Sequence, residues 1–417
     1  MKKIYTLLFA LLISVQLFAG GFQINEQGAK AMAMADAFTG IANNPSAIFF
    51  NPAGITQLNG TQFLGGVSLI APSAKFIGPS PLTTEWKMEN QIFTPFDIYA
   101  THQFSDRFFA GLGVNNQYGL GTKWPQDWIG NQLAVETNIK SFFFTPVIAY
   151  KFSDQFSLSA GAVIAYADVK IMNSIEDPLT GKADVLVDLT GNKTGFGFTA
   201  GLMYKPINEL SLGLSYRSKV KFDFAGTATS TPAGFTYPGV GFIPFPNGDI
   251  SAPLTTPQNI TFGIGIMPSP DLTLAADFQY VGWSSYDKLE ITFKNYDLDP
   301  LTPGVQSTES IDRKYKNTFI VRGGAEYKFS DVFALRGGIY FDKNPIKDEY
   351  VEPQLPDGNR IGFNLGFGYK FTPNFGVDFA YLLLTVADRQ VTNSVFGFNG
   401  TYKNFINIVG LDFSYNL

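Results

Sequence analysis

Cysteine is missing from this 417-residue sequence, and charged residues and histidine are scarce. Without cysteine there is no disulfide framework, thiolate metal site or cysteine nucleophile. Charged residues make up only 16% of the chain, against roughly a quarter in ordinary domains. The net charge of -5 offers no basic footprint for nucleic acid. The single histidine, His102, has no polar constellation around it for catalysis or metal binding. We therefore expect no catalytic residue, no metal, no cofactor and no nucleic-acid partner.

Long apolar runs are also missing, except at the N-terminus. Residues 1–20, MKKIYTLLFALLISVQLFAG, place Lys2 and Lys3 before an unbroken apolar stretch that ends in small residues at Ala19 and Gly20. This is the layout of a secretory signal peptide, and an N-terminal membrane anchor is the alternative. No later stretch approaches the ~18 apolar residues of a membrane-spanning helix. We expect an exported protein that reaches the periplasm, the exterior or the outer membrane.

Aromatic residues and glycine are abundant, with 41 Phe, 19 Tyr and 42 Gly. They occur in runs with a period of two, which is typical of strands. In residues 210–224, alternate residues from Leu210 are mostly apolar, and Arg217 and Lys219 fall on the polar face. A β-sandwich with a dry core is one explanation. The runs of about eleven to fifteen residues instead favour strands that cross a bilayer, because globular strands are mostly five or six residues long. Charge placement agrees, because a Lys or Arg facing lipid costs ~2–4 kcal/mol at the midplane.

A short phrase recurs between these runs, with YKFSD at residues 150–154 and 327–331. Its relatives HQFSD, YKPIN, MPSPD and YKFTP begin at His102, Tyr204, Met267 and Tyr369. Turn residues flanked by aromatics suit short periplasmic hairpins at a membrane interface. Six such turns join twelve strands, and one further strand at each end makes fourteen. The sequence therefore predicts an all-β fold: a 14-stranded antiparallel transmembrane β-barrel with both termini periplasmic and the longer loops outside the cell.

Residues 21–60 precede the first predicted strand and show no alternation. The stretch QGAKAMAMADAF is rich in alanine and compatible with one or two short helices. Such a segment is not expected to fold alone, so it either trails in the periplasm or fills the barrel as a plug. We therefore divide the chain into a signal peptide (1–20), an N-terminal hatch (21–60) and a barrel (61–417).

This N-terminal segment also carries a family resemblance. GFQINEQ at residues 21–27 and NPAG at residues 51–54 resemble the opening of mature outer-membrane transporters of the FadL family. The resemblance covers the whole mature chain. It implies a fourteen-stranded barrel with a hatch in its lumen that takes up long-chain fatty acids or, in some branches, aromatic hydrocarbons. It does not imply an enzyme.

The resemblance also suggests site residues. It places Asn51, Pro52 and Ala53 in a hatch turn whose movement opens a passage. It implies an inward kink in the third strand, which makes a lateral opening to the lipid. The candidates for this opening are Asn116, Tyr118, Gly119 and Gly121. As an alternative, the two glycines simply begin an external loop.

Two further groups are candidate ligand contacts. Phe22, Phe49 and Phe50 either line an internal pocket or only pack against the barrel wall. An apolar cluster in the predicted external loop 225–255 is expected to capture ligand, or else to form a lid. Its members are Phe235, Tyr237, Phe242, Ile243 and Phe245. Trp124 and Trp128 are expected to anchor the barrel at the outer interface.

These features predict passive uptake of hydrophobic small molecules by loop capture, hatch rearrangement and lateral release into the bilayer. A polar-solute diffusion porin is the alternative, but it would need an unobstructed lumen. An outer-membrane hydrolase is disfavoured by the isolated His102. The expected partners are the hydrophobic ligand, outer-membrane lipid and the barrel-assembly machinery, although the terminal strand ends in Leu417 where that machinery usually reads Phe. We expect a monomer.

Overall fold

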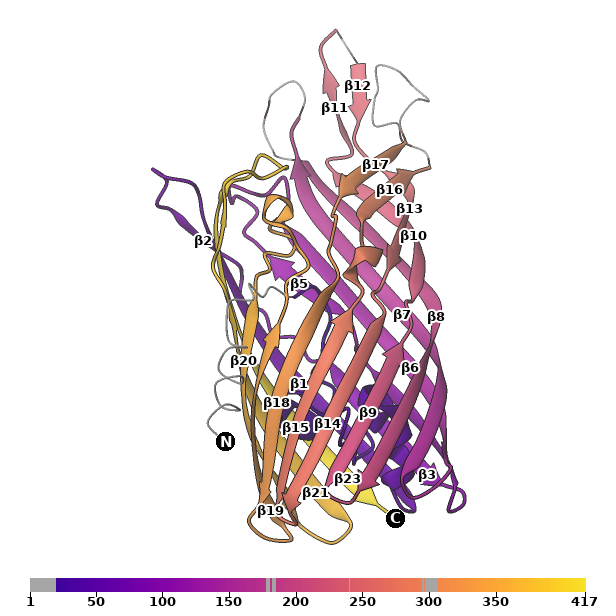
Figure 1. The fold of residues 1–417 in the computed structure, drawn as a ribbon. Coiled ribbons are helices and arrows are strands. Elements are labelled where there is room, and N and C mark those ends of the chain that lie inside the picture. The colour runs from indigo at the N-terminus through magenta and orange to yellow at the C-terminus, as the bar shows by residue number, and fades with distance from the viewer. Residues whose placement is uncertain (1–19, 178–180, 182–184, 240, 295, 297–306) are drawn as a thin grey trace.

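The barrel is the main feature of the computed structural model, which describes residues 20–177, 181, 185–239, 241–294, 296 and 307–417 (Figure 1). Apart from Gly20, the predicted signal peptide lies outside the described residues. Within the described part of the chain, fourteen antiparallel strands neighbour one another in chain order. They are β1 (Thr61–Ile77), β3 (Phe96–Gln103), β4 with β5 (Phe108–Asn115 and Gly119–Lys123), β6 (Glu136–Lys151), β7 (Phe156–Ile175), β8 (Val185–Ile207), β9 with β10 (Leu210–Arg217 and Lys221–Thr231), β13 with β14 (Gly248–Thr255 and Asn259–Ser269), β15 with β16 (Leu272–Val281 and Lys288–Phe293), β17 with β18 (Thr308–Asp312 and Thr318–Lys328), β19 (Phe333–Asp342), β20 (Arg360–Lys370), β21 (Phe375–Val386) and β23 (Gly400–Asn416).

The first and last strands close the barrel. β1 pairs with β23 from Gln62 opposite Asn416 to Ile77 opposite Thr401. Because the first strand pairs with the last, neither of them is left as a free edge strand in lipid. The predicted 14-stranded antiparallel barrel is confirmed.

Shorter elements decorate this barrel. They are β2 (Glu85–Lys87), β22 (Arg389–Val391), the hairpin of β11 (Gly234–Tyr237) and β12 (Gly241–Pro244), and the 3-10 turns η2 (Trp283–Ser285) and η3 (Asp348–Tyr350). None of the described helices is long and apolar enough to cross a membrane.

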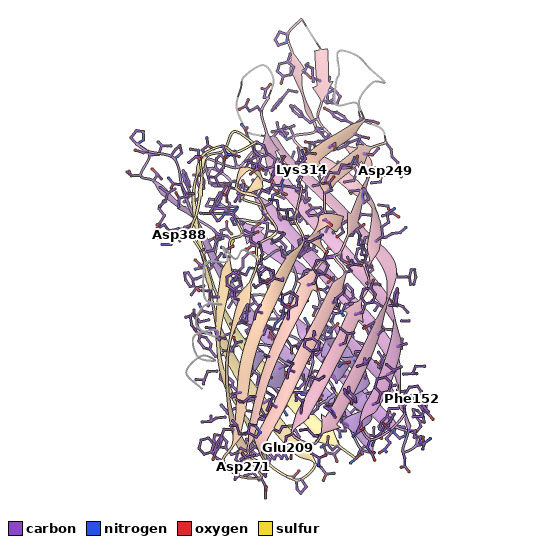
Figure 2. All side chains as sticks on the ribbon, viewed as in Figure 1. Phe152, Glu209, Asp249, Asp271, Lys314 and Asp388 are labelled. Atoms are coloured by element: carbon purple, nitrogen blue, oxygen red, sulfur yellow. The ribbon has the colours of Figure 1, made fainter. Side chains whose placement is uncertain are left out.

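The recurring phrase forms a common turn. At 150–154, the amides of Phe152 and Ser153 both donate to the carbonyl of Phe156. The same pair of bonds closes the turns that begin at Phe104, Phe329 and Phe371. An aromatic residue two positions earlier packs edge-on against the turn phenylalanine, as between Tyr150 and Phe152, whose ring centroids are 4.9 Å apart. Phe152, Glu209 and Asp271 mark three of the turns at one end of the barrel, away from Asp249, Lys314 and Asp388 (Figure 2).

The predicted strand 210–224 is interrupted by a bulge. β8 pairs Thr199 with Arg217 of β9 but Asn192 with Ala225 of β10, which leaves one extra residue in the β9/β10 strand. One extra residue reverses which side chains face inward and which face outward along the rest of the strand. Arg217 is directed inward, as predicted, and reaches the hatch. Lys219 was predicted to lie on the same face as Arg217. This prediction is wrong, because the bulge directs Lys219 to the outside of the barrel, where it is exposed.

The barrel wall continues well past its apolar belt, so the predicted external loop 225–255 is shorter than expected. The ends of β7 and β8 and much of residues 225–255, in β10 and β13, belong to this extension. In this extension the apolar residues face inward and bury one another. They are Val187, Leu189, Ala228, Ile250, Leu289, Ile291 and Phe293. The sequence alternates with a period of two in the apolar belt and in the extension alike. Only the burial of the apolar side chains shows whether a row faces lipid or the core.

The N-terminal region lies inside the barrel (Figure 1), with α2 (Ala29–Ala33), α3 (Ala47–Phe50) and the 3-10 helix η1 (Pro52–Gln57). Helices this short are unstable alone. Wall side chains hold them. Asp412 Oδ2 accepts from the Ala29 amide at 2.6 Å, where α2 begins. Asp277 Oδ2 accepts from the Thr39 amide at 2.9 Å. This helical region is consistent with the predicted hatch.

Asp36 is a destabilising feature of this hatch. Its side chain is buried, and neither carboxylate oxygen has a hydrogen-bond partner. Burial and the neighbouring Glu26 carboxyl raise the pKa of Asp36 well above its usual range. The folded state therefore holds this proton more tightly than the unfolded chain does. Stability falls as the pH rises from the unfolded value of about 3.9 toward the raised folded value.

Asp36→Asn should therefore stabilise the hatch, because Asn does not titrate and tolerates the backbone φ of 57° at this position. We expect the free energy of hatch opening to increase by about 1–2 kcal/mol at pH 8 and by less at pH 5. Hydrogen exchange of the α2 amides measures this difference. Asp106→Asn, at an exposed turn, is the matched control. A larger gain at pH 5 than at pH 8 would contradict the role of the charge.

Candidate functional site

The third barrel strand is broken between Asn115, which ends β4, and Gly119, which begins β5. β4 pairs with both β3 and β6, whereas β5 pairs with β6 alone. Asn116 supports the break with its side-chain amide: Oδ1 accepts from the Phe96 amide at 2.8 Å and Nδ2 donates to the Ser141 carbonyl at 2.6 Å. These two bonds take the place of backbone hydrogen bonds between strands. The Phe96 amide and the Ser141 carbonyl therefore remain paired where the third strand separates from β3.

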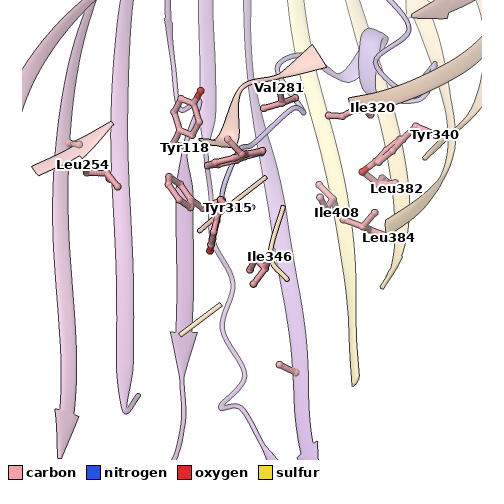
Figure 3. Close-up of a cluster of buried hydrophobic side chains, with 14 of the residues drawn as sticks. Tyr118, Leu254, Val281, Tyr315, Ile320, Tyr340, Ile346, Leu382, Leu384 and Ile408 are labelled. Atoms are coloured by element: carbon pink, nitrogen blue, oxygen red, sulfur yellow. The ribbon is translucent and has the colours of Figure 1, made fainter. Parts of the chain in front are cut away.

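A cavity of about 680 Å³ lies at this break. Its lining includes lumen residues such as Tyr340 and Ile408, which face Tyr118 across the interior in Figure 3. It also includes Phe142 and Ile92, whose side chains are 40% and 69% exposed on the outer surface of the barrel. Residues from both sides of the wall thus line one space. The cavity extends from the lumen into the wall at the break.

The N-terminal end of the hatch, residues 21–27, borders this cavity, and we call it the hatch arm. Gln23 forms an antiparallel bridge with Tyr118. The Ile24 amide donates to the Gln117 carbonyl at 2.9 Å, and the Gly119 amide donates to the Phe22 carbonyl at 3.0 Å. The hatch arm therefore pairs with the segment that links β4 to β5, beyond the residues that pair with β3.

A buried ion pair holds the start of the hatch arm. Asp357 Oδ2 accepts from the Gly21 amide at 2.5 Å, and Arg360 Nη2 donates to the Gly21 carbonyl at 2.7 Å. The two side chains bind each other through Arg360 Nε and Asp357 Oδ1, 3.0 Å apart. Gly21 has a φ of 99°, and an added Cβ would lie 2.3 Å from the Trp283 ring. Only glycine fits at this position.

Two side chains occupy the gap in the wall. Ile24 of the hatch arm fills the space beside Gly119, where an added Cβ would lie 2.7 Å from Ile24 Cδ1. On the other side, Phe93 lies against Gly121, where an added Cβ would lie 1.9 Å from Phe93 Cζ. Phe93 is fixed to β1 by a bridge to Ile70, with hydrogen bonds of 2.8 and 2.9 Å. Both glycines leave room for a neighbouring apolar side chain.

The sequence-based candidates separate into two groups around this cavity. Phe22 lines the large cavity, and so do all four candidates for the lateral opening. They are Asn116, Tyr118, Gly119 and Gly121. Phe22 also packs edge-on against Trp283, with ring centroids 4.9 Å apart.

Phe49 and Phe50 lie elsewhere and pack against the hatch and the wall. The Arg217 guanidinium lies 3.9 Å from the Phe49 ring centroid and donates to the Phe49 carbonyl at 2.8 Å. Phe50 packs edge-on against Phe38. Because α3 faces the wall around Arg217, these two phenylalanines do not line the large cavity, although they border a small one of about 20 Å³.

The NPAG turn forms the contact between hatch and wall. Asn51 Nδ2 donates to the carbonyls of Thr39 and Leu202, each at 3.0 Å, and Oδ1 accepts from the Ala53 amide at 3.2 Å. Pro52 occupies the first position of η1, where its missing amide is tolerated. An added Cβ at Gly201 would lie 2.3 Å from Asn51 Oδ1. The bond to Leu202 of β8 therefore joins the turn to the wall, and the bonds to Thr39 and Ala53 fix its shape within the hatch.

The predicted capture cluster lies on or beside the β11/β12 hairpin, which projects above the barrel (Figure 1). Phe242 is 61% exposed near its tip, whereas Phe245 is 3% exposed and packs against Phe235, with centroids 5.5 Å apart. Tyr237 donates to the Asp177 carboxylate. Phe245 is thus part of the base of the hairpin, and Phe242 is its exposed apolar group.

A second, smaller cavity of about 80 Å³ lies in the extension of the barrel. Apolar side chains dominate its lining, and Phe22, Leu120, Ile139 and Leu355 border both cavities. Arg313 and Glu352 in its wall form a buried ion pair with each other. The two cavities lie along one apolar path that is interrupted at Phe22, which borders both of them.

The two loop tryptophans are not interface anchors. Trp124 and Trp128 are fully buried and stack on each other, with ring centroids 4.4 Å apart. Trp124 Nε1 donates to the Pro353 carbonyl at 3.1 Å. The prediction that they act as interface anchors is wrong, because the extended wall and its loops cover them.

Sequence reasoning missed Asp357, Arg360 and Phe93. The Gly21 amide and its Asp357 acceptor are separated by 336 positions in the chain, and no local pattern connects them. Among the described residues, no group of three or more His, Asp or Glu side chains could hold a metal ion.

Comparisons with known proteins agree with this geometry. A family model described as "Outer membrane protein transport protein (OMPP1/FadL/TodX)" matches residues 10–417. A putative outer membrane protein of Neisseria meningitidis serogroup B is 25% identical and covers 100% of this chain and 98% of its own. The long-chain fatty acid transport protein of Escherichia coli K12 is 24% identical, covering 97% and 96% respectively.

Solved structures share the fold. A Pseudomonas aeruginosa FadL homologue superimposes with a TM-score of 0.81 at 22% identity, covering 95% of this chain and 100% of its own. The Pseudomonas putida toluene transporter TodX gives 0.72 at 15% identity, covering 94% and 99%. The predicted family resemblance is confirmed. The chain is an outer membrane β-barrel that belongs to the OMPP1/FadL/TodX family, whose members are non-enzymatic channels for hydrophobic compounds.

Proposed function

We propose that this protein takes up hydrophobic small molecules passively across the outer membrane and releases them sideways into the bilayer, with long-chain fatty acids as the first candidate ligand. The observation that carries the proposal is the extension of the large cavity from the lumen into the wall at the break between Asn115 and Gly119. An apolar ligand gains about 0.8 kcal/mol per methylene on leaving water. A route that ends in lipid retains this gain.

Ligand would enter from the external side. In this proposal, Phe242 on the β11/β12 hairpin contributes to capture, and ligand passes through the small cavity in the barrel extension to the large one. The two cavities share Phe22, so movement of the hatch arm would join them. Asn51 to Ala53 would remain with the part of the hatch that is fixed to the wall.

The same arrangement assigns a gating role to the hatch arm. The arm's backbone closes the broken strand through its bonds to Gln117 and Gly119. Ligand that displaces Phe22 would break these bonds and withdraw Ile24 from the gap. Gating of this kind requires one orientation of the barrel. The end that carries the short turns and the C-terminus must face the periplasm.

Long-chain fatty acids are proposed first because curated relatives named for that activity align over almost the whole chain. Aromatic hydrocarbons are the second ligand class, because solved toluene transporters share the fold. The cavity lining is apolar enough for either ligand class.

Uptake measurements test this proposal directly. Cells that lack their own fatty-acid and hydrocarbon transporters should accumulate labelled oleate or labelled toluene when they express this protein. A labelled small sugar should enter no faster than in cells with an empty vector. Sugar entry without uptake of either hydrophobic ligand would refute the proposal and favour a diffusion porin.

A further inference from the structure

We propose that Lys140 holds the anionic headgroup of an amphipathic ligand at the lateral end of the large cavity. The inference rests on the proposed function, because it assumes that ligand leaves through the gap in the wall. It specifies the ligand chemistry at the exit: a single-chain amphiphile with a carboxylate or a similar anionic group.

The interior of the cavity is unsuitable for such a headgroup. Within the described lining, the charged residues are Glu26, Lys140, Asp357 and Arg360. Arg360 is already paired with Asp357 at 3.0 Å and lies 3.7 Å from Asp342. It also donates to the hatch arm. A buried carboxylate without a counter-charge is strongly unfavourable, so an anionic headgroup finds no unpaired cation in the interior of this cavity.

The second cavity offers no partner either. Arg313 is bound to Glu352 and donates to Gln354 Oε1 at 3.1 Å. To receive a ligand carboxylate, Arg313 would have to abandon a buried acid. Removing one partner from a buried ion pair is costly.

Lys140 differs from these arginines in position and in pairing. It lies on β6 between the buried Ser141 and the cavity-lining Ile139, so it belongs to the outward row that includes Phe142. Its side chain is exposed. Among the described carboxylates, none lies within the 4.0 Å of an ion pair. The ammonium is therefore accessible at the mouth of the cavity.

The neighbouring strands leave this mouth open. Across the ladder, Lys140 lies opposite Gly119 of β5, which has no side chain. On the other side it lies opposite Asp168 of β7, which competes electrostatically without forming an ion pair. By contrast, Lys170 binds Glu136 at 2.9 Å. Gly119 places no side chain over Lys140, and the space beside it is filled by Ile24 of the hatch arm. Withdrawal of Ile24, as in the proposed gating, would give a headgroup access to Lys140.

This position matches the way in which an amphiphile must leave. Phe142, two residues along the same outward row, is exposed where the barrel faces lipid. Lys140 therefore lies at the water-facing edge of that apolar surface. A ligand whose carboxylate stays beside Lys140 keeps its head hydrated while its tail passes Phe142 into the bilayer. The charge is therefore not buried at the exit.

Substitutions at position 140 test the inference. The purified protein, in a neutral detergent without anionic lipid, is titrated with labelled oleate and with oleyl alcohol, which has the same tail and no charge. Lys140→Met should weaken oleate binding by up to about fivefold, the upper end of the range for an exposed ion pair. Lys140→Arg should preserve it, and oleyl alcohol should be unaffected by either change. Asp168→Asn should strengthen oleate binding by removing the competing acid.

Lys219→Met is the matched control, because Lys219 is also exposed on the outside of the barrel but does not line the cavity. It should leave both ligands unchanged. Equal weakening of oleate and oleyl alcohol by Lys140→Met, or no weakening of oleate, would overturn the inference. Loss of binding to phosphatidylglycerol vesicles alone would also overturn it and make Lys140 a membrane-lipid contact. If the unmodified protein binds neither oleate nor oleyl alcohol, the proposed function fails as well.

Discussion

A disulfide between the hatch arm and the third barrel strand is expected to stop uptake. Gln23 and Tyr118 lie directly opposite each other, between hydrogen bonds that join Ile24 to Gln117 and Gly119 to Phe22. Such a pair is of the non-hydrogen-bonded type, with Cα atoms about 4.5 Å apart, which suits a disulfide. The chain has no cysteine of its own, so Gln23→Cys with Tyr118→Cys gives one defined cross-link.

The oxidised double variant should take up labelled oleate at the background rate, because the backbone of the hatch arm can no longer leave the broken strand. Reduction with dithiothreitol should restore uptake to the level of the reduced protein. Comparing the two redox states of one variant cancels any loss of packing from Tyr118, and each single cysteine variant controls for the reagents. Unchanged uptake after complete cross-linking would show that ligand passes without release of the arm.

The fold was predictable because its determinants are local and repeated. The alternation from Leu210 to Leu214 and the turn phrase at Tyr150 each follow from a few adjacent residues. Repetition then makes the strand number a matter of counting turns. A lipid-facing strand and its turn need no knowledge of distant residues.

The reversal after Arg217 shows where local reasoning fails. Leu214 and Phe222 have the same parity in the sequence, but a one-residue bulge between them directs the first to lipid and the second to the core. The residues at the bulge, Ser218 to Val220, continue the alternation and give no signal of it. Register against β8 decides the face, and register is a property of two strands.

The candidate site was predictable only in part for the same reason. Asn116 and Gly119 were identified through a family pattern in one strand. Asp357 and Phe93 reach the cavity from distant segments, where each looks like an ordinary loop residue. Asp357 binds the hatch arm, and Phe93 packs against Gly121. Only the folded barrel brings these partners together.

Deletion of residues 21–60 is expected to turn the protein into an open polar channel. Barrel closure between β1 and β23 uses no hatch residue, so the wall should still assemble. The wall groups that the hatch now covers are polar, including Asp277, Arg322 and Asp412. Water can solvate these groups once the hatch is gone, whereas an apolar lumen would collapse or aggregate.

Planar-bilayer recordings and sugar efflux from liposomes measure this change. The intact protein should show little steady conductance, and the deletion variant should show large, stable openings and rapid sugar efflux. The oxidised Gln23→Cys/Tyr118→Cys protein is the opposite control, with a hatch that cannot leave. If a correctly folded deletion variant conducts no better than the intact protein, the hatch is not the barrier to polar solutes. The loops and the apolar core of the barrel extension would then have to supply that barrier.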